Sequence, residues 1–225
     1  VGSGSDTFLN IEAINGSNFN DSLTGSSSAN YINGGIGADI MTGGGGSDTY
    51  WVNNVGDQVV ESDANVVTGG NDTVYSYLSN YTLTNNVEIG RIAVSTAANL
   101  TGNGLNNILY SGAGNNVLDG GAGFDTVSYA AAAAAVNVSL ATNIAQNTGG
   151  SGTDTLLNDE GIIGSTYNDT LTGSTANNRI WGGAGNDVIS GGAGADVLSG
   201  GVGSDSFVYT NHNDSTLSSM DTIVD

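Results

Sequence analysis

An apolar position recurs every nine residues along much of this chain, always in the same polar setting. In each nine-residue unit the first five positions are rich in glycine, the sixth is Asp or Asn, and the eighth is apolar or aromatic. Three contiguous units at 182–208 read GGAGNDVIS, GGAGADVLS and GGVGSDSFV. An apolar side chain between polar neighbours fits a short strand with one buried face. Each unit therefore predicts a turn followed by a strand.

The units fall into three blocks. They begin at 16, 25, 34 and 43, then at 102, 111 and 120, and then at 164, 173, 182, 191 and 200. Residues 1–50 also match 149–198 at a constant offset of 148, and in both copies six residues (10–15 and 158–163) separate two units. The pattern predicts modules of one repeat array rather than unrelated domains.

A turn and a strand in nine residues make half a coil, so two units complete one coil of an all-β, right-handed parallel β-roll. No helical period of useful length appears. The run Ala130–Ala135 favours a helix by propensity but is too short to form one alone, so we expect strand or loop there. We expect a first β-roll block at 1–60, a β-rich connector at 61–101, a short β-roll block at 102–128, an insert at 129–148, a second main β-roll block at 149–208 and a truncated trailing segment at 209–225. Because residues 1–6 already read as the middle of a repeat, we expect an excerpt of a longer protein.

Composition adds a strong negative charge to this picture. The 225 residues include 37 glycines, no proline and no cysteine, and the net charge is -20 with only Arg91 and Arg179 as strong bases. Such a chain repels nucleic acid and anionic membranes, and without bound counter-charge it favours disorder. The longest apolar run, 130–136, is too short to cross a bilayer, so no membrane insertion is expected. Metal cations are the expected partners, together with neighbouring copies or modules of the same protein.

The turn residues supply the chemistry for such a cation. Glycine at the first, second and fourth positions permits a tight turn with positive φ that exposes carbonyl oxygens. Sixth-position carboxylates 18 residues apart then face each other in stacked coils, and they repel unless a cation lies between them. An all-oxygen cage suits Ca²⁺, whereas zinc sites need nitrogen or sulfur ligands. The sequence therefore predicts several calcium ions.

The candidate ligands are sixth-position side chains and turn residues that offer carbonyls. They are Asp6, Asp21, Gly35, Gly37, Asp39, Asp48, Asp57, Gly120, Asp125, Gly150, Gly152, Asp154, Asp169, Gly182, Gly183, Gly185, Asp187, Gly191, Gly192, Gly194, Asp196, Gly200, Val202, Asp205, Asn211 and Asp214. The best slots pair Asp187 with Asp205, Asp21 with Asp39, and Asp169 with Asp187. The slots Asn178/Asp196, Asn30/Asp48 and Asn107/Asp125 carry one charge fewer and should bind more weakly.

Three further pairings are hypotheses about register. Asp196 faces Asp214 if the third block continues through Leu217, and the six-residue inserts let Asp6 face Asp21 and Asp154 face Asp169. Glu12 and Glu160 occupy matching places in those inserts, where they either add a ligand or polarise the turn.

These repeats resemble the RTX (repeats-in-toxin) family of hemolysin-type calcium-binding repeats. The resemblance implies that positions two, four and six of one unit and positions one, three and six of the unit after next hold one Ca²⁺. It implies one site from Gly183, Gly185 and Asp187 with Gly200, Val202 and Asp205, and another from Gly192, Gly194 and Asp196 with Tyr209, Asn211 and Asp214. Units 25–33 and 102–119 depart from the pattern, because they lack glycines or carry Asn in place of Asp.

The resemblance also implies secretion from a Gram-negative bacterium by a type I system, with folding on extracellular Ca²⁺. Two functions remain open: a structural module of an adhesin or surface-layer protein, or the accessory calcium-binding and secretion domain of an exported protease, lipase or polysaccharide-modifying enzyme. The chain has no HExxH zinc motif, no GxSxG elbow and no Cys–His pair, so no catalytic residue is assigned. His212 is expected to face solvent, and Tyr50, Trp51, Tyr167 and Trp181 to pack in the core or at sheet edges.

Overall fold

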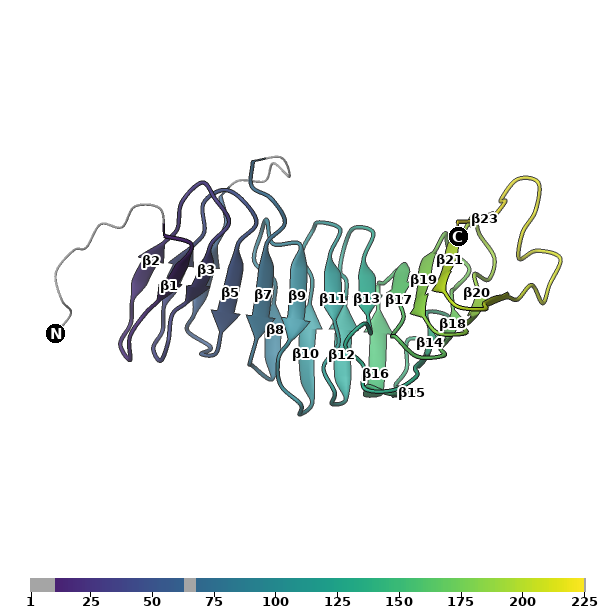
Figure 1. The fold of residues 1–225 in the computed structure, drawn as a ribbon, viewed down its shortest axis with the longest axis horizontal. Helices are drawn as coiled ribbons and strands as arrows, with labels where there is room; N and C mark the ends of the chain where they lie inside the picture. The colour runs from purple at the N-terminus through teal and green to yellow at the C-terminus, as the bar shows by residue number, and fades with distance from the viewer. Residues whose placement is uncertain (1–10, 63–67, 225) are drawn as a thin grey trace.

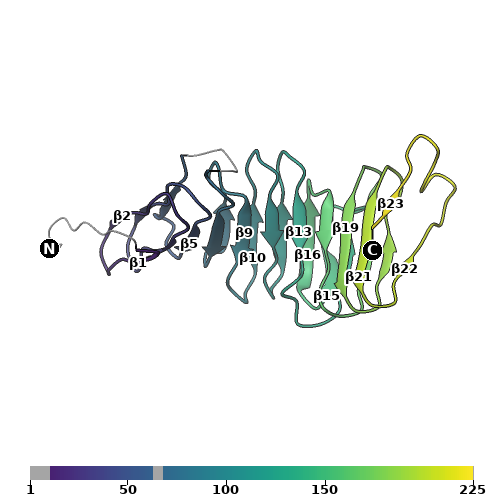
Figure 2. The ribbon, with the colours of Figure 1, turned by 45° about the horizontal axis from the view of Figure 1, so that its top comes forward.

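The computed structural model describes residues 11–62 and 68–224, and every regular element in them is a strand. Figure 1 shows these strands stacked as successive coils of one elongated solenoid. Each regular coil contributes one strand to each of two faces, and the view in Figure 2 shows the faces from another side. The predicted all-β parallel roll is confirmed.

The first face is a single eleven-stranded sheet. Its strands are β1 (Ala13–Asn15), β3 (Tyr31–Asn33), β5 (Thr49–Val52), β7 (Thr73–Ser76), β9 (Ile89–Ile92), β11 (Ile108–Tyr110), β13 (Thr126–Ser128), β17 (Gly161–Ile163), β19 (Arg179–Ala184), β21 (Val197–Val202) and β23 (Thr222–Ile223).

The second face is divided into three sheets of three, five and four strands. The first holds β2 (Ser22–Thr24), β4 (Ile40–Thr42) and β6 (Gln58–Val60). The second holds β8 (Asn80–Thr82), β10 (Ala98–Thr101), β12 (Asn116–Asp119), β16 (Gly152–Leu157) and β15 (Gln146–Gly149). The third holds β14 (Asn137–Ser139), β18 (Thr170–Thr172), β20 (Val188–Ser190) and β22 (Ser206–Phe207).

The nine-residue period sets the register of the regular coils. Leu23 pairs with Met41 in β2 and β4, and Ile180 pairs with Leu198 in β19 and β21, each 18 residues apart. Because two units close one coil, every eighth-position side chain falls on the side chain of the coil below. The parallel ladder therefore follows directly from the repeat.

The core is one continuous column of these eighth-position side chains. Ile32, Met41, Tyr50, Leu109, Leu118, Val127, Leu171, Ile180, Ile189 and Leu198 are all at most 1% exposed. Leu23 and Phe207 are only partly buried against this column. Apolar burial of this kind supplies most of the favourable free energy of each coil.

The predicted connector at 61–101 consists of further coils of the same solenoid. Its β-prone stretches form β7 to β10, and β7 and β9 lie within the eleven-stranded sheet. Asp57 keeps the repeat register, since the backbone N–H of Asp39 donates to its Oδ1 at 3.1 Å. One inward position is glycine, where a Cβ on Gly90 would meet Leu100 Cδ2 at 2.8 Å, so leucines from the opposite face fill its place.

The insert at 129–148 adds strands to the second face. The alanine run forms turns and bends without a helix, as expected. After β13 the chain runs as β14, which pairs with β18 of the next coil, and β15 then pairs antiparallel with β16, which pairs with β12 of the preceding coil. The second face therefore has three strands here, where a regular coil has one.

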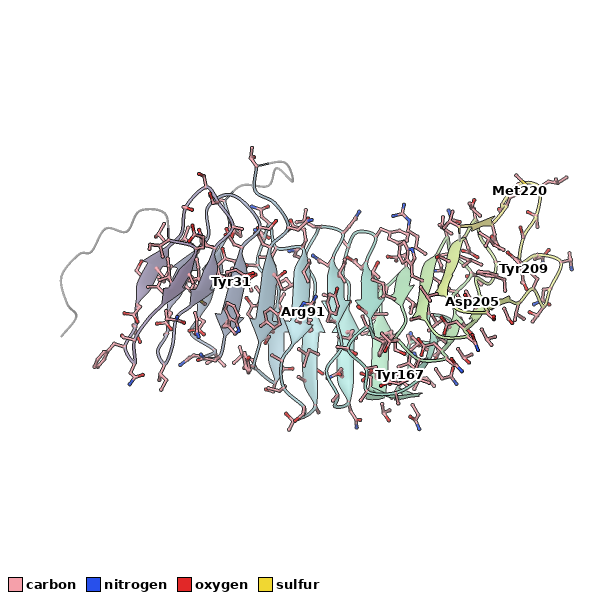
Figure 3. All side chains as sticks on the ribbon, viewed as in Figure 1. Tyr31, Arg91, Tyr167, Asp205, Tyr209 and Met220 are labelled. Atoms are coloured by element: carbon pink, nitrogen blue, oxygen red, sulfur yellow. The ribbon has the colours of Figure 1, made fainter. Side chains whose placement is uncertain are left out.

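Aromatic and cationic side chains gather on the outer surface of the first face. Trp51 stacks on Tyr75 with ring centroids 5.7 Å apart, and the guanidinium of Arg91 lies 3.4 Å from the ring centroid of Tyr110. Figure 3 shows Arg91 midway along this face. Trp51 and Trp181 thus lie outside the core, whereas Tyr50 is in it, and Tyr167 is 46% exposed in a turn.

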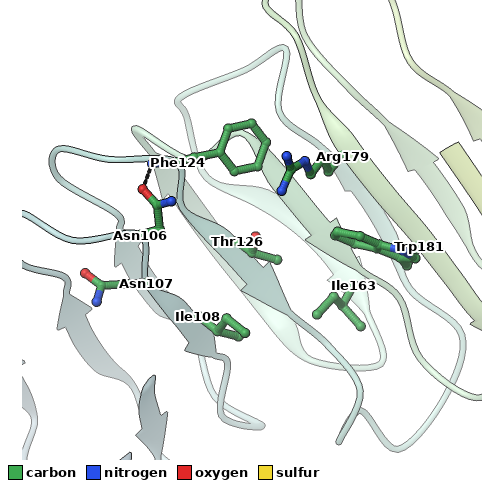
Figure 4. Close-up of a pocket in the computed structure, with 8 residues that line it drawn as sticks. All are labelled: Asn106, Asn107, Ile108, Phe124, Thr126, Ile163, Arg179 and Trp181. Atoms are coloured by element: carbon green, nitrogen blue, oxygen red, sulfur yellow. Dashed lines mark hydrogen bonds between the residues drawn. The ribbon is translucent and has the colours of Figure 1, made fainter. Parts of the chain in front are cut away.

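A shallow groove opens on the same face farther along the roll. It has a volume of about 400 Å³ and lies between Phe124, Ile163, Arg179 and Trp181, as Figure 4 shows. Arg179 stacks over Phe124 at 4.8 Å. In the part of the chain that the structure describes, no helix is long and apolar enough to span a membrane.

Candidate metal centres

The turns of the solenoid form two rows, one along each edge. The first row precedes the strands of the first face and places these residues in line: Glu12, Asn30, Asp48, Asp72, Glu88, Asn107, Asp125, Glu160, Asn178, Asp196 and Asp221. The second row lies at strands of the second face and includes Asp21, Asp39, Asp57, Asn116, Asp154, Asp169, Asp187 and Asp205. Asn116 is the first residue of β12 and Asp154 lies within β16, whereas the other residues directly precede their strands. Acidic or amide side chains therefore stack along both edges.

Hydrogen bonds connect neighbouring members of each row where the 18-residue spacing is kept. The backbone N–H of Asp187 donates to Oδ1 of Asp205 at 2.8 Å, and that of Asn178 donates to Oδ1 of Asp196 at 2.8 Å. The same bond joins Asp21 to Asp39, Asn30 to Asp48, Asn107 to Asp125 and Asp169 to Asp187. One oxygen of each acceptor carboxylate is thereby held in a hydrogen bond between coils. Whether the turn can bind a ligand then depends on the contacts of the second oxygen.

In turns with a serine at the second position, the turn itself satisfies that second oxygen. Ser17 donates its backbone N–H to Asp21 Oδ2 at 2.6 Å, and Ser165 donates its own to Asp169 Oδ2. Ser174 donates in the same way to the single side-chain oxygen of Asn178 at 2.6 Å. Asn53 makes the equivalent bond to Asp57 Oδ2 at 3.0 Å. These turns complete their own hydrogen bonding.

In five of the Gly-Gly-x-Gly-x-Asp turns, the second oxygen has no hydrogen-bond partner. Buried and unpartnered Oδ2 atoms belong to Asp39, Asp48, Asp125, Asp187 and Asp196. An unsatisfied buried carboxylate oxygen is costly, so each such atom requires an explanation. A bound cation is the simplest partner for it.

Glycine conformation opens the space in which these oxygens meet. Gly183 and Gly185 have φ of +107° and +123°, in the left-handed region that other residues seldom adopt. At the first position, a Cβ on Gly182 would collide with Asp187 Oδ2 and lie 2.6 Å from the carbonyl oxygen of Gly200. A carboxylate oxygen of one coil and a carbonyl oxygen of the next therefore converge on a cradle that any side chain would fill.

Burial makes these carboxylates hard to ionise without a cation. It raises the pKa of Asp187, Asp196 and Asp125 above the usual value, and it raises the pKa of Asp48 to about 6. A nearby divalent ion reverses this effect by favouring the charged form. The donor set of carboxylate and carbonyl oxygens fits Ca²⁺.

The structure brings together all six strong and weak pairs that the sequence predicts to face each other, including Asp187 with Asp205 and Asn30 with Asp48. It also brings the predicted carbonyl donors into register, since Gly183 pairs with Gly201 and the Gly185 N–H donates to the Val202 carbonyl at 2.8 Å. Their role as metal ligands stays a prediction.

The predicted partner of Asp196 is wrong. The Asp196 N–H donates to Oδ1 of Asp221 at 3.0 Å, and β21 pairs with β23, so the register jumps by 25 residues in place of 18. Asp214 instead accepts backbone N–H groups of Thr210 and Asn211 at 2.7 and 2.8 Å, and these bonds lower its pKa. The loop after β22 is simply longer than one repeat unit.

The predicted pair of Asp154 and Asp169 is also wrong. Asp154 Oδ1 accepts the N–H of Asn116 at 2.8 Å, whereas Asp169 Oδ1 accepts that of Val136. The insert places β14 between them on the second face. Gly149 and Gly152, with φ of +75° and +91°, close the β15–β16 hairpin, and Gly150 donates its N–H to Ala135 O at 3.1 Å. Asp6 lies outside the described residues.

Several acids in or beside these rows do not occupy sixth positions of nine-residue units. Asp72 follows Asp48 by 24 residues, and Glu88 and Glu160 replace the sixth-position Asp, as shown by the Asp125 N–H donating to Glu160 Oε2 at 3.0 Å. Asp159 has both carboxylate oxygens buried without a partner, and burial beside Asp125 raises its pKa to about 9. The insert at 158–163 is therefore a shortened half-coil in which Glu160 takes the place of the sixth-position aspartate.

A family comparison identifies the repeats. The model of the RTX calcium-binding nonapeptide repeat matches residues 15–50, 97–128, 163–198 and 172–207, which together cover just over half of the chain. The chain belongs to the RTX calcium-binding repeat family. Its β-roll is accordingly a calcium-binding structural module. No curated protein matches the chain.

The matched RTX segments coincide with the regular coils. They leave out 51–96, where Asp72 follows Asp48 by 24 residues, and 129–162, which contains β14 to β16. The glycine turns that carry unpartnered carboxylate oxygens at Asp39, Asp125, Asp187 and Asp196 all lie inside matched segments.

Proposed function

We propose that this chain is the calcium-dependent structural module of a secreted bacterial RTX protein that folds on extracellular Ca²⁺, as part of an adhesin or surface-layer protein. The observation that carries the proposal is the buried, unpartnered Oδ2 in the glycine turns. With Ca²⁺ in the turns, these oxygens gain a partner and the stacked coils become stable.

Electrostatics explains why the fold depends on the ion. The chain carries a net charge of -20, and each turn row stacks its acids one coil apart, about 4.8 Å along the sheet. Like charges at that spacing destabilise the coil unless they are neutralised. A cytosol poor in calcium then keeps the chain unfolded for export, and calcium outside the cell drives folding.

The elongated architecture favours a structural role over that of an accessory domain of an enzyme. The eleven-stranded sheet runs from β1 to β23 without interruption. The predicted connector supplies β7 and β9 to it, and the insert adds strands to the second face. A rod of stacked coils with repeated ion sites suits a spacer or surface assembly. The blocks at 1–60, 102–128 and 149–208 are in this proposal segments of one rod, with the intervening segments serving as coils of modified length.

A calcium titration followed by far-UV circular dichroism tests the proposal. In excess chelator the chain should be largely unfolded, and added Ca²⁺ should produce β structure in a cooperative transition. Equal Mg²⁺ should be much less effective, because Mg²⁺ holds its waters and demands octahedral geometry. A complete β spectrum in chelator, unchanged by calcium, would refute the proposal.

A further inference from the structure

Directly after β6, Glu61 places a carboxylate where regular turns carry a glycine. Glu61 stands 18 residues after Gly43, at the first position of its turn. In regular turns this position is glycine, and its carbonyl oxygen faces the first glycine of the coil before, as Gly200 faces Gly182. Beside Gly43, a carboxylate oxygen of Glu61 takes that place, close to Oδ2 of Asp48 and the hydroxyl of Tyr50.

Three carboxylates meet at this turn. One oxygen each from Asp48, Glu61 and Asp72 lies within 4.8 Å of the others. The three side chains are 0%, 8% and 1% exposed, respectively. They come from three separate chain segments, so the fold rather than a local motif brings them together.

Hydrogen bonds hold the three side chains in this arrangement. The Asp48 N–H donates to Asp72 Oδ1 at 2.7 Å, and the Tyr50 hydroxyl donates to Glu61 Oε1. Asn86 Nδ2 donates to the carbonyl oxygen of Glu61 at 3.0 Å, which fixes the backbone there. The cluster is therefore positioned by β5, by the end of β6 and by the turn before β9.

Two oxygens of this arrangement have nothing to bind. Oδ2 of Asp48 and Oε2 of Glu61 are buried without a hydrogen-bond partner. The chain contains no lysine, and its two arginines stack on aromatic rings of the outer surface, Arg91 on Tyr110 and Arg179 on Phe124. Neither arginine therefore neutralises this cluster, and a metal ion is the partner that its oxygens fit.

We propose that Asp48, Glu61 and Asp72 hold a divalent cation, Ca²⁺, at a three-carboxylate site that the nonapeptide pattern does not describe. Glu61 and Asp72 fall outside every segment that the family model matches, whereas Asp48 lies within 15–50. The site rests on the proposed function only for the identity of the ion. A third carboxylate raises its negative charge above that of the two-carboxylate repeat slots, and ligand charge tunes Ca²⁺ affinity. This site therefore binds the first ion.

Ion counting by native mass spectrometry at limiting free Ca²⁺ tests the site in the whole chain. Glu61→Gln keeps the acceptor for Tyr50 but removes the charge, and it should weaken the first binding step about tenfold or more, since ligand charge governs Ca²⁺ affinity. Asp72→Asn should do the same, which guards against one variant failing to fold. Asp119→Asn, which removes one carboxylate charge at the end of β12 and outside the two turn rows, is the control and should leave that step unchanged. If both cluster variants bind the first ion as the wild type does, the proposal is wrong.

The same variants separate this site from the repeat sites. Asp187→Asn should weaken later binding steps and leave the first unchanged. An effect of Glu61→Gln without any effect of Asp187→Asn would keep the site and refute calcium binding by the repeat turns. An effect of Asp187→Asn alone would refute the site and keep the proposed function.

Terbium luminescence locates the first ion. Trp51 directly follows Tyr50 in β5, whereas Trp181 lies six strands farther along the same sheet, about 29 Å away at the spacing of paired strands. At one equivalent of Tb³⁺, Trp51→Phe should abolish most tryptophan-sensitised emission and Trp181→Phe should preserve it. Emission that survives Trp51→Phe and disappears in Trp181→Phe would place the first ion elsewhere and overturn the proposal.

Discussion

The backbone N–H of Asp187 donates a 2.8 Å hydrogen bond to Oδ1 of Asp205 one coil further on, while Oδ2 of Asp187 is buried without a partner. This pairing gives each carboxylate of the row two separate tasks. One oxygen joins adjacent coils by a hydrogen bond, and the other remains for a cation. Turns with serine at the second position lack the second task, because their own backbone satisfies it, as Ser165 does for Asp169.

Removing the charge at a glycine turn should weaken calcium-dependent stability. Asp187→Asn retains an oxygen for the ladder but replaces the unpartnered Oδ2 by an amide, so we expect a loss of about 1.5–3 kcal/mol, the size of an interaction with a charged group. Chemical denaturation in saturating Ca²⁺ measures it. Asp119→Asn is the control: its carboxylate accepts a hydrogen bond from the exposed Asn158, and the variant should change stability little. Equal stabilities of the two variants would contradict the role given to Asp187.

Replacing a glycine that has positive φ should destabilise the fold, whereas replacing a glycine that has open space and ordinary φ should not. Gly183 has φ of +107°, and a Cβ there would collide with the carbonyl oxygen of Ser165. Gly183→Ala should cost at least about 1–2 kcal/mol from backbone strain alone. Gly104 has open space around it, so Gly104→Ala should be neutral or slightly stabilising. Thermal unfolding in Ca²⁺ compares the two, and similar melting temperatures would argue against the observed turn geometry.

Acid should partly replace calcium. In the metal-free fold, burial raises the pKa of Asp48 to about 6, of Glu61 to about 7, of Asp72 to about 8 and of Asp159 to about 9. A raised pKa in the folded state contributes stability that is complete below the unfolded value and is lost as pH rises through the folded value. The metal-free chain should therefore gain β structure between about pH 9 and about pH 5.

Calcium affinity should follow the opposite trend. Because Ca²⁺ binds the ionised carboxylates, its binding releases protons and strengthens as pH rises over the same window. Circular dichroism of the metal-free chain across pH, together with calorimetry in buffers of different ionisation enthalpy, measures both effects. Metal-free β content that increases with pH would contradict the burial of these groups.

Each coil should also depend on its apolar column. Ile189 is fully buried, whereas Leu217 is 97% exposed. Ile189→Ala should cost about 2–5 kcal/mol through lost burial and the cavity left behind. Leu217→Ala should remain within about 0.5 kcal/mol of wild type. Denaturation in saturating Ca²⁺ distinguishes them, and a small effect of Ile189→Ala would mean that the ions alone hold the coils.

The nine-residue period predicts most of the fold because it determines both the turn and the register. Ile180 over Leu198 and Asp187 over Asp205 follow from the 18-residue spacing alone. The period fails where the loop between half-coils changes length. Asp221 replaces Asp214 opposite Asp196, and Asp154 pairs with Asn116, because sheet pairing of β23 and β16 decides the register there.

Glu61 shows a different limit of sequence reasoning. Its 18-residue spacing from Gly43 is visible in the sequence, but a glutamate at a glycine position looks like the end of the repeat. Only the packing of its carboxylate against Asp48 and Asp72 reveals a possible ligand. The sequence pattern identifies ligands that follow the repeat. A ligand that stands at an unexpected repeat position, such as Glu61, is identified only from its tertiary contacts.

A crystal structure grown in calcium, with anomalous differences recorded, tests the central claim most directly. We predict anomalous peaks about 2.3–2.6 Å from Oδ2 of Asp39 and Asp187, the distance of Ca²⁺–oxygen bonds. Oδ2 of Asp57, which Asn53 already satisfies, should have no peak at that distance. Glycine turns that remain free of calcium in such crystals, with the coils still intact, would contradict the account.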